Sequence, residues 1–202
     1  MAVSYFKRFG FLHIPKTGGT TLLNHFKEYL TDLVIDPVLT HSCFIDVCNA
    51  MDKNKQLRWF ALVRNPYDRI YSAFVFLKTF YPTTEWCTFK EMLVYAKTNT
   101  EDHILLRPMT FFICKDDIAK FDITIYYYEN FNSSVSEIAS YLDIPSVIKK
   151  NFRVNHVAQE CSNNSGLKYS DIYTNDHELI ALINEIYFED FKTFHYTMLS
   201  TS

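Results

Sequence analysis

The sequence is poor in glycine, proline and cysteine. Its 202 residues include only four Gly and six Pro, which argues against a low-complexity or fibrous protein. The five Cys are odd in number and form no C-x-x-C pair, so we expect neither a disulfide scaffold nor a zinc site. We interpret them as free thiols in a reducing compartment.

Long apolar runs and a strong net charge are also missing. No stretch approaches the ~18 apolar residues of a membrane span, and the apolar segment 9–14 is too short for the core of a signal peptide. A net charge of −3 gives no bulk attraction to nucleic acid or an anionic membrane, although a local basic pocket is compatible with it. We therefore expect a cytoplasmic protein without a membrane span or a nucleic-acid partner.

Hydrophobic residues, by contrast, are abundant and follow the spacing of alternating strands and helices. Three segments rich in apolar or aromatic residues are predicted to form strands of a parallel sheet: residues 9–14, 59–63 and 123–130. Apolar residues at helical spacing follow each run and recur near the end of the chain, over residues 20–30, 66–77, 131–142 and 179–194. This alternation predicts one α/β domain over 1–202, with a P-loop-type parallel sheet and helices on both faces.

The motif HIPKTGGTT, residues 13–21, follows the first predicted strand and opens a helix. Glycines allow the backbone to approach a ligand closely, the N–H groups at a helix start point at an anion, and the lysine adds a positive charge. The motif therefore predicts a phosphate-binding loop, although an ordinary loop with a threonine cap stays an alternative. Its expected ligand-binding residues are Pro15, Lys16, Thr17, Gly18, Gly19, Thr20 and Thr21.

The order of residues in this loop differs from that of an ATP-binding protein. The pattern G-x-x-x-x-G-K-[ST] places the lysine after the glycines, whereas Lys16 precedes them. A P-loop kinase also needs an acidic residue at a strand end to hold magnesium, and Glu129 is the nearest candidate. Because Glu129 is equally compatible with a structural role, a kinase is the alternative reading rather than the preferred one.

A second motif, VRNPYDRIYSAF, follows the strand at 59–63. Arg64 stands at the strand end and Ser72 lies eight residues further on, after Asn-Pro has turned the chain into a helix. The two side chains are expected to converge. A guanidinium fork with a hydroxyl suits a dianionic phosphate monoester.

Together the two motifs resemble the sulfotransferases that use 3′-phosphoadenosine 5′-phosphosulfate (PAPS). They are close to the carbohydrate branch, whose members read H-I-P-K-T-G-G-T-S and V-R-D-P-Y-E-R-x-x-S-A-Y. Further likenesses are HILLRPMTFF, YYYENF and the last helical stripe, with Met109 where Gln is usual and His195 where Gly is usual. The match spans most of residues 9–196.

The resemblance implies transfer of a sulfuryl group from PAPS to an acceptor hydroxyl, expected on a carbohydrate, with no metal required. The first motif would hold the 5′-phosphosulfate, with Lys16 neutralising the leaving group. Arg64 and Ser72 would hold the 3′-phosphate. A non-catalytic module that binds 3′,5′-ADP is an alternative of another class.

The general base is expected among the seven histidines. The segment THSCFID places His41 in a context similar to the catalytic histidine of heparan sulfate 2-O-sulfotransferases, and His103 is the alternative. Lys168 lies in a stretch similar to the loop that closes over the nucleotide in relatives, so it is either a phosphate contact or a solvated lysine. Acceptor specificity is expected in residues 78–110 and 145–175, the least regular parts of the sequence.

Overall fold

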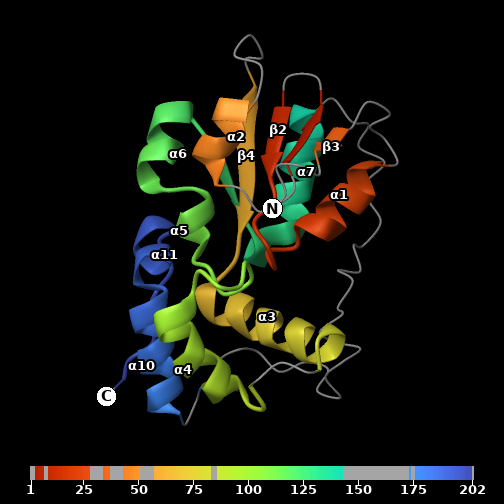
Figure 1. The fold of residues 1–202 in the computed structure, drawn as a ribbon. Helices are drawn as coiled ribbons and strands as arrows, with labels where there is room; N and C mark the ends of the chain where they lie inside the picture. Colours follow the sequence, from red (N-terminus) through yellow and green to blue (C-terminus); the bar gives the residue numbers. More distant parts are fainter. Residues whose placement is uncertain are drawn as a thin grey trace. The chain divides into compact units, whose positions relative to one another are not determined.

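The computed structural model describes residues 3–6, 9–27, 34–36, 43–50, 57–82, 86–142, 173 and 176–201 (Figure 1). The chain forms two compact units. The first consists of Met1–Arg64 and Phe111–Val154, and the second of Asn65–Thr110 and Asn155–Ser202. No helix in the described part of the chain is long and apolar enough to cross a membrane.

The first unit contains a five-stranded sheet in the order β3-β1-β2-β4-β5. The strands are β1 (Val3–Phe6), β2 (Phe9–Leu12), β3 (Val34–Asp36), β4 (Arg58–Val63) and β5 (Thr124–Tyr127). The three predicted apolar runs form the neighbouring parallel strands β2, β4 and β5, in which Leu12 pairs with Ala61 and Val63 pairs with Tyr127. Strand β1 is antiparallel to both of its neighbours.

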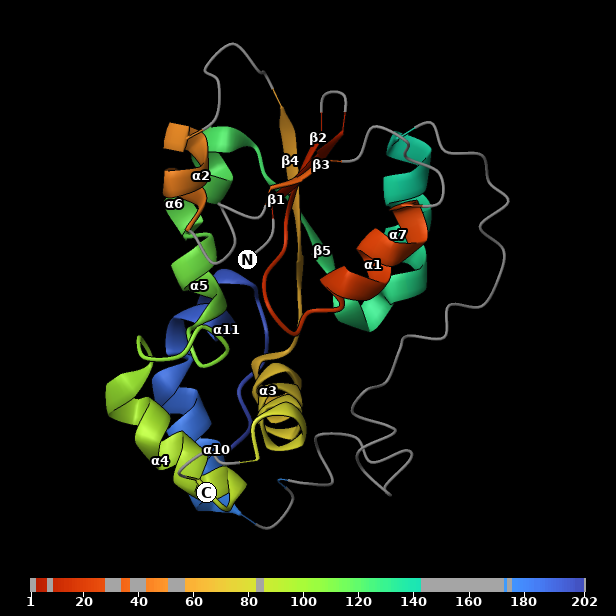
Figure 2. The same cartoon turned by 45° about the vertical axis from the view of Figure 1, so that its right-hand side comes forward.

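Helices cover both faces of this sheet, as the sequence predicts. Figure 2 shows α1 (Gly19–Lys27) and α7 (Phe131–Tyr141) on one face, and α2 (Phe44–Ala50) and α6 (Lys115–Phe121) on the other. Apolar residues of α1 and α7 pack on Phe11, Phe60 and Leu62 of the sheet. On the opposite face the Phe44 ring lies 5.2 Å from the Trp59 ring between centroids. The predicted α/β fold of P-loop type is thereby confirmed.

The third predicted strand is shorter than expected. Strand β5 ends at Tyr127, and Tyr128–Asn130 form a 3-10 turn that leads into α7 at Phe131. The hydroxyl of Ser134 on α7 donates to the carbonyl of Tyr127 at 3.2 Å, which joins the strand end to the helix. The chain thus leaves β5 through a turn that brings Tyr128 to the carboxyl edge of the sheet.

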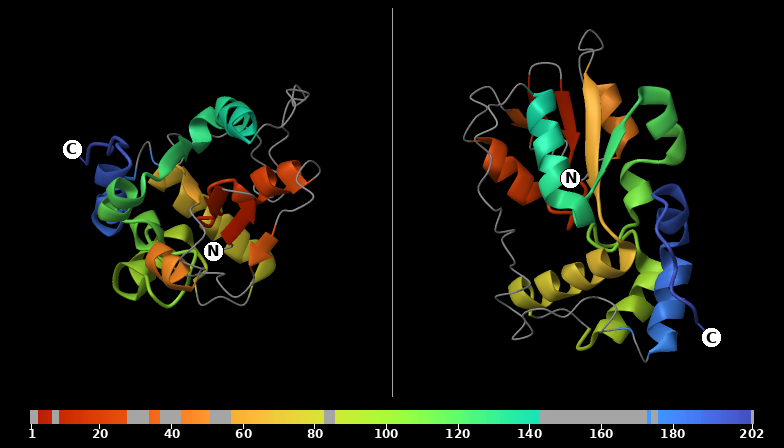
Figure 3. Two further views of the ribbon diagram at one scale, coloured as in Figure 1. Left: turned by 90° about the horizontal axis from the view of Figure 1, so that it is seen from above. Right: turned by 180° about the vertical axis from the view of Figure 1, so that it is seen from behind.

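The second unit is helical. Its helices are α3 (Pro66–Phe80), α4 (Phe89–Asn99), α10 (His177–Ile186) and α11 (Phe188–Thr193), and α5 (Met109–Phe112) begins in it. Helices α4 and α10 lie side by side (Figure 3). The expectation that residues 78–110 are irregular is therefore wrong: a capping box formed by Thr88 and Glu91 starts α4, and Met92, Leu93 and Ala96 bury one face of it.

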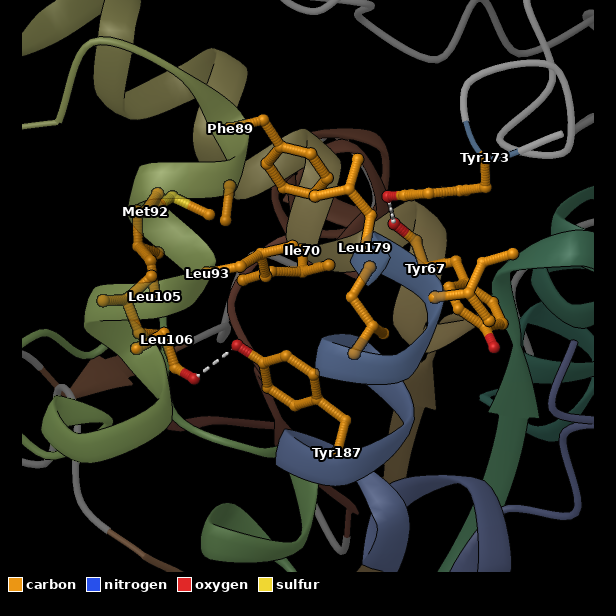
Figure 4. Packing of buried hydrophobic residues seen from close by; sticks show 14 of the residues in the cluster. Tyr67, Ile70, Phe89, Met92, Leu93, Leu105, Leu106, Tyr173, Leu179 and Tyr187 are labelled. Atoms are coloured by element: carbon orange, nitrogen blue, oxygen red, sulfur yellow. Dashed lines mark hydrogen bonds between the residues drawn. The ribbon is translucent and has the colours of Figure 1, made fainter. Parts of the chain in front are cut away.

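The core of the second unit combines apolar side chains with buried hydroxyls (Figure 4). The Tyr187 hydroxyl donates to the carbonyl of Leu106 at 2.8 Å, and the Tyr173 hydroxyl donates to the carbonyl of Tyr67 at 3.1 Å. Tyr187 also divides the predicted helix 179–194 into α10 and α11.

Buried charged groups hold the start of α5 and the residues just before it in place. The carboxylate of Asp190, which is fully buried, accepts hydrogen bonds from the Met109 N–H at 2.8 Å and from the N–H and hydroxyl of Thr110 at 2.8 and 2.9 Å. Arg69, also fully buried, donates to the carbonyl of Arg107 at 2.6 Å. Burial raises the pKa of Asp190, while Arg69 and the three hydrogen bonds oppose that rise.

Candidate functional site

The loop between β2 and α1 has an unusual backbone. Lys16 has φ 67° and Gly18 has φ 92°, so two left-handed residues flank Thr17. The Thr17 hydroxyl donates to the carbonyl of Ile14 at 2.8 Å, and Thr17 is fully buried, so its side chain stabilises the loop from inside. Backbones of this kind turn successive N–H groups toward one point and form anion-binding concavities.

Both glycines of the loop lie against aromatic rings. A Cβ atom on Gly18 would lie 2.8 Å from Cδ2 of Tyr128, and a Cβ on Gly19 would lie 2.3 Å from Cδ2 of His13. These separations are shorter than van der Waals contact, so neither position accepts a side chain without a shift of its neighbour. The two rings therefore fix the loop where its backbone would face a ligand.

Arg64 reaches the same loop from the end of β4. Because β2, β4 and β5 are parallel neighbours, their carboxyl ends meet at one edge of the sheet. Nη1 of Arg64 donates to the carbonyl oxygen of Lys16 at 3.4 Å. The guanidinium carbon of Arg64 lies 4.2 Å from the centroid of the Tyr128 ring, within the range of a cation–π contact.

Two cations thus share one edge of the sheet. The pKa of Lys16 falls to about 8, chiefly because burial disfavours the ammonium and secondly because Arg64 repels it. The negative charge of a bound anion would oppose both effects and raise this pKa. The donor set of this edge is a cationic guanidinium, an ammonium, and the backbone N–H groups of a glycine loop at a helix start, which fits a phosphate-bearing ligand.

The remaining predicted residues of the loop have differing exposure. Pro15 is buried, Thr20 is exposed and Thr21 is half-buried. Thr20 and Thr21 are in the first turn of α1, where N–H groups lack partners within the helix. In the part of the chain that the structure describes, no group of three or more His, Cys, Asp or Glu is arranged to hold a metal ion.

Among the described residues, two of the predicted site residues belong to the second unit. Ser72 is in α3 and only 8% exposed. Since Arg64 belongs to the first unit and Ser72 to the second, their convergence stays a prediction. His103 is half-buried, and its Nδ1 accepts a hydrogen bond from the N–H of Leu105 at 3.2 Å. Burial lowers the pKa of its imidazole.

His41 and Lys168 lie outside the described residues, as does most of the stretch 145–175. Their roles stay predictions. Met109, which replaces the usual Gln, is fully buried. Two residues of the site were not predicted, His13 and Tyr128. The sequence offered a signal for Tyr128, because it stands near the end of the predicted third strand, 123–130, and the carboxyl ends of parallel strands meet at one edge of the sheet.

The fold and the loop define the class first: an α/β protein with a glycine loop at the carboxyl edge of a parallel sheet, where ligands of such folds bind. A family model described as the sulfotransferase family matches residues 1–197. The chain therefore belongs to the sulfotransferase family, and it is an enzyme that takes the sulfuryl group from PAPS. Membership of this family excludes the alternative that the protein is a P-loop kinase.

Neither the search of curated proteins nor that of solved structures returned a match.

Proposed function

We propose that this enzyme transfers the sulfuryl group of PAPS to a hydroxyl of a carbohydrate, by in-line displacement with a histidine as general base. The observation that carries the donor half of the proposal is the contact of Arg64 with the carbonyl of Lys16 beside the paired glycines. The carbohydrate acceptor rests on the likeness of the two motifs to the carbohydrate branch.

The donor supplies an activated sulfuryl group, with 3′,5′-ADP as the leaving group. Gly18, Gly19, Thr20 and Thr21 hold its 5′ end through backbone N–H groups and hydroxyls. Lys16 holds a positive charge where negative charge grows on the leaving oxygen, the kind of preorganised contact that is worth ~10²–10³ in rate.

Arg64 and Ser72 hold the 3′-phosphate in this proposal. Arg64 is suited to the role because its guanidinium is already oriented by the Lys16 carbonyl and the Tyr128 ring. An oriented planar fork loses less conformational entropy when it binds a phosphate. Lys168 is a further candidate contact to the phosphates.

His41 is the proposed base, and the geometry of His103 supports this choice. Because Nδ1 of His103 accepts the N–H of Leu105, the neutral ring carries its proton on Nε2. Neither nitrogen then has a lone pair available for the proton of an acceptor hydroxyl. We assign His103 to the wall of the acceptor side rather than to proton transfer.

A cytoplasmic location is proposed from the thiols. Cys43, Cys48, Cys87 and Cys114 are free, which suits a reducing compartment.

The donor assignment is tested by thermal shift with 3′,5′-ADP and 5′-AMP at matched concentration. A ligand at about 100 times its Kd raises the free energy of unfolding by ~2.7 kcal/mol, and 3′,5′-ADP should shift the Tm far more than 5′-AMP. Arg64→Ala should remove most of the difference. Equal shifts for the wild type would contradict the role of Arg64.

The base is tested by transfer from radiolabelled PAPS to a carbohydrate panel. His41→Ala should lower the rate by ~10²–10⁴ while leaving 3′,5′-ADP affinity within a few-fold. His103→Ala should keep most of the rate. If His103→Ala is inactive and His41→Ala is active, the assignment of the base is wrong.

A further inference from the structure

One aromatic ring connects the two parts of the donor site. The Tyr128 ring has Gly18 at its Cδ2 edge and the Arg64 guanidinium over its face, 4.2 Å from the centroid. Arg64 in turn donates to the carbonyl of Lys16, two residues before Gly18. The chain of contacts is therefore closed: Lys16 and Gly18 in the loop, Tyr128 after β5, and Arg64 after β4.

The Tyr128 ring also packs against the hydrophobic core of the first unit. Tyr128 is half-buried in the 3-10 turn after β5, and its ring centroid lies 5.8 Å from that of Phe131, which belongs to the core under α1 and α7. Phe131 also lies 3.2 Å from the position that a Gly18 Cβ would occupy. Tyr128 is thus fixed by the core on one side and contacts both phosphate-binding elements on the other.

We propose that Tyr128 is a positioning residue for the sulfuryl donor, whose ring holds the Arg64 guanidinium in register with the Gly18 turn so that the 3′- and 5′-phosphates are bound together. The inference depends on the proposed role of Arg64. The face of the Tyr128 ring, and not its hydroxyl, positions the guanidinium, because the guanidinium lies over that face.

The measured quantity is the discrimination ratio, the Kd for 5′-AMP divided by the Kd for 3′,5′-ADP. Tyr128→Leu removes the cation–π contact and should lower this ratio about three- to thirtyfold, the range that corresponds to a partly desolvated cation–π contact. Tyr128→Phe keeps the ring and should keep the ratio. In the Arg64→Ala background, Tyr128→Leu should change the ratio no further, since the guanidinium that the ring positions is gone.

Tyr126→Leu is the matched control for lost aromatic packing. Tyr126 is half-buried on β5, the strand that leads into the turn with Tyr128, and its ring centroid lies 6.2 Å from that of Phe60. This variant should lower the Tm without lowering the discrimination ratio. A fall in the ratio equal to that of Tyr128→Leu would overturn the inference, because general loosening of the β5 region would then explain both.

A second measurement avoids the risk that Tyr128→Leu does not fold. Phenylalanines with one, two and three ring fluorines at position 128 keep the ring size and progressively weaken its negative face, so the ratio should fall stepwise with fluorination. A ratio that stays constant across the series overturns the inference, as does a folded Tyr128→Leu with wild-type discrimination. A loss in Tyr128→Phe as large as in Tyr128→Leu overturns it in favour of a hydroxyl contact.

The test also separates this inference from the assignment beneath it. If Arg64→Ala alone keeps wild-type discrimination, the 3′-phosphate role of Arg64 is wrong and this inference fails with it. If Arg64→Ala loses discrimination while the Tyr128 variants keep it, the donor assignment stands and only the role of the ring is refuted.

Discussion

The affinity for 3′,5′-ADP should fall between pH 7 and pH 9 because of Lys16. In the free protein its pKa is about 8, since burial and Arg64 both disfavour the ammonium. A bound phosphate favours the ammonium and raises that pKa. Binding above pH 7 must therefore take up a proton at Lys16, and the affinity decreases as fewer molecules carry that proton.

The size of the effect follows from the pKa. A lysine with a pKa of about 8 is about 90% charged at pH 7 and about 90% neutral at pH 9, so the Kd should rise about tenfold, or ~1.4 kcal/mol. The second pKa of a phosphate ester is ~6 and the pKa of a histidine side chain is ~6.5, so neither group accounts for a change in Kd between pH 7 and pH 9.

Isothermal titration calorimetry in two buffers of different ionisation enthalpy measures the proton uptake directly. Uptake should rise from about 0.1 proton per complex at pH 7 to about 0.9 at pH 9. Lys16→Arg keeps its charge over this range and should bind with a Kd that does not depend on pH. A constant wild-type Kd, or the same fall in Lys16→Arg, would refute the reasoning.

The free protein should respond to pH in the opposite sense. The folded-state pKa of Lys16 lies below the unfolded value of ~10.4, so the unfolded chain binds more protons between about pH 8 and 10.4. The contribution of Lys16 to the free energy of unfolding is therefore least favourable below pH 8 and improves as the pH rises through this window.

The central strands and the position of the glycine loop between β2 and α1 could be predicted because their signals are local. The apolar runs that form β2 and β4 are each bounded by a motif at the strand end. Helix α4 also has a local signal, the T-x-x-E capping box at 88–91. Strand β1 has only four residues, and its antiparallel direction is set by pairing with β2 and β3. The spacing of apolar residues in the sequence does not reveal such pairing.

Features that depend on contacts between distant segments could not be predicted. The break between α10 and α11 occurs at Tyr187, whose hydroxyl bonds to the carbonyl of Leu106. Likewise, the two motifs predict that Lys16, Gly18 and Arg64 bind a ligand, whereas the contact of the Tyr128 ring with Gly18 depends on the pairing of β5 with β4. The position of Tyr128 near a strand end could be predicted, whereas its contact with the glycine loop could not.

Two further predictions concern the free energy of unfolding, measured with urea. Asp190→Asn should lower the free energy of unfolding by about 3 kcal/mol, because an amide NH₂ would face the N–H donors of Met109 or Thr110 in a buried site. Asp116→Asn, at an exposed position, is the control. A loss under about 1 kcal/mol for Asp190→Asn would contradict the burial argument. His195→Gly should raise the free energy of unfolding by about 0.5–1 kcal/mol. His195 follows α11 with φ 57°, and the N–H of Tyr196 donates back to the carbonyl of Phe191 at 3.0 Å, which is the helix end at which glycine is favoured. His195→Ala keeps the Cβ atom and should give no such gain. If His195→Gly lowers the free energy of unfolding instead, the imidazole contributes more than the left-handed backbone costs, and the histidine at this position is stabilising in its own right.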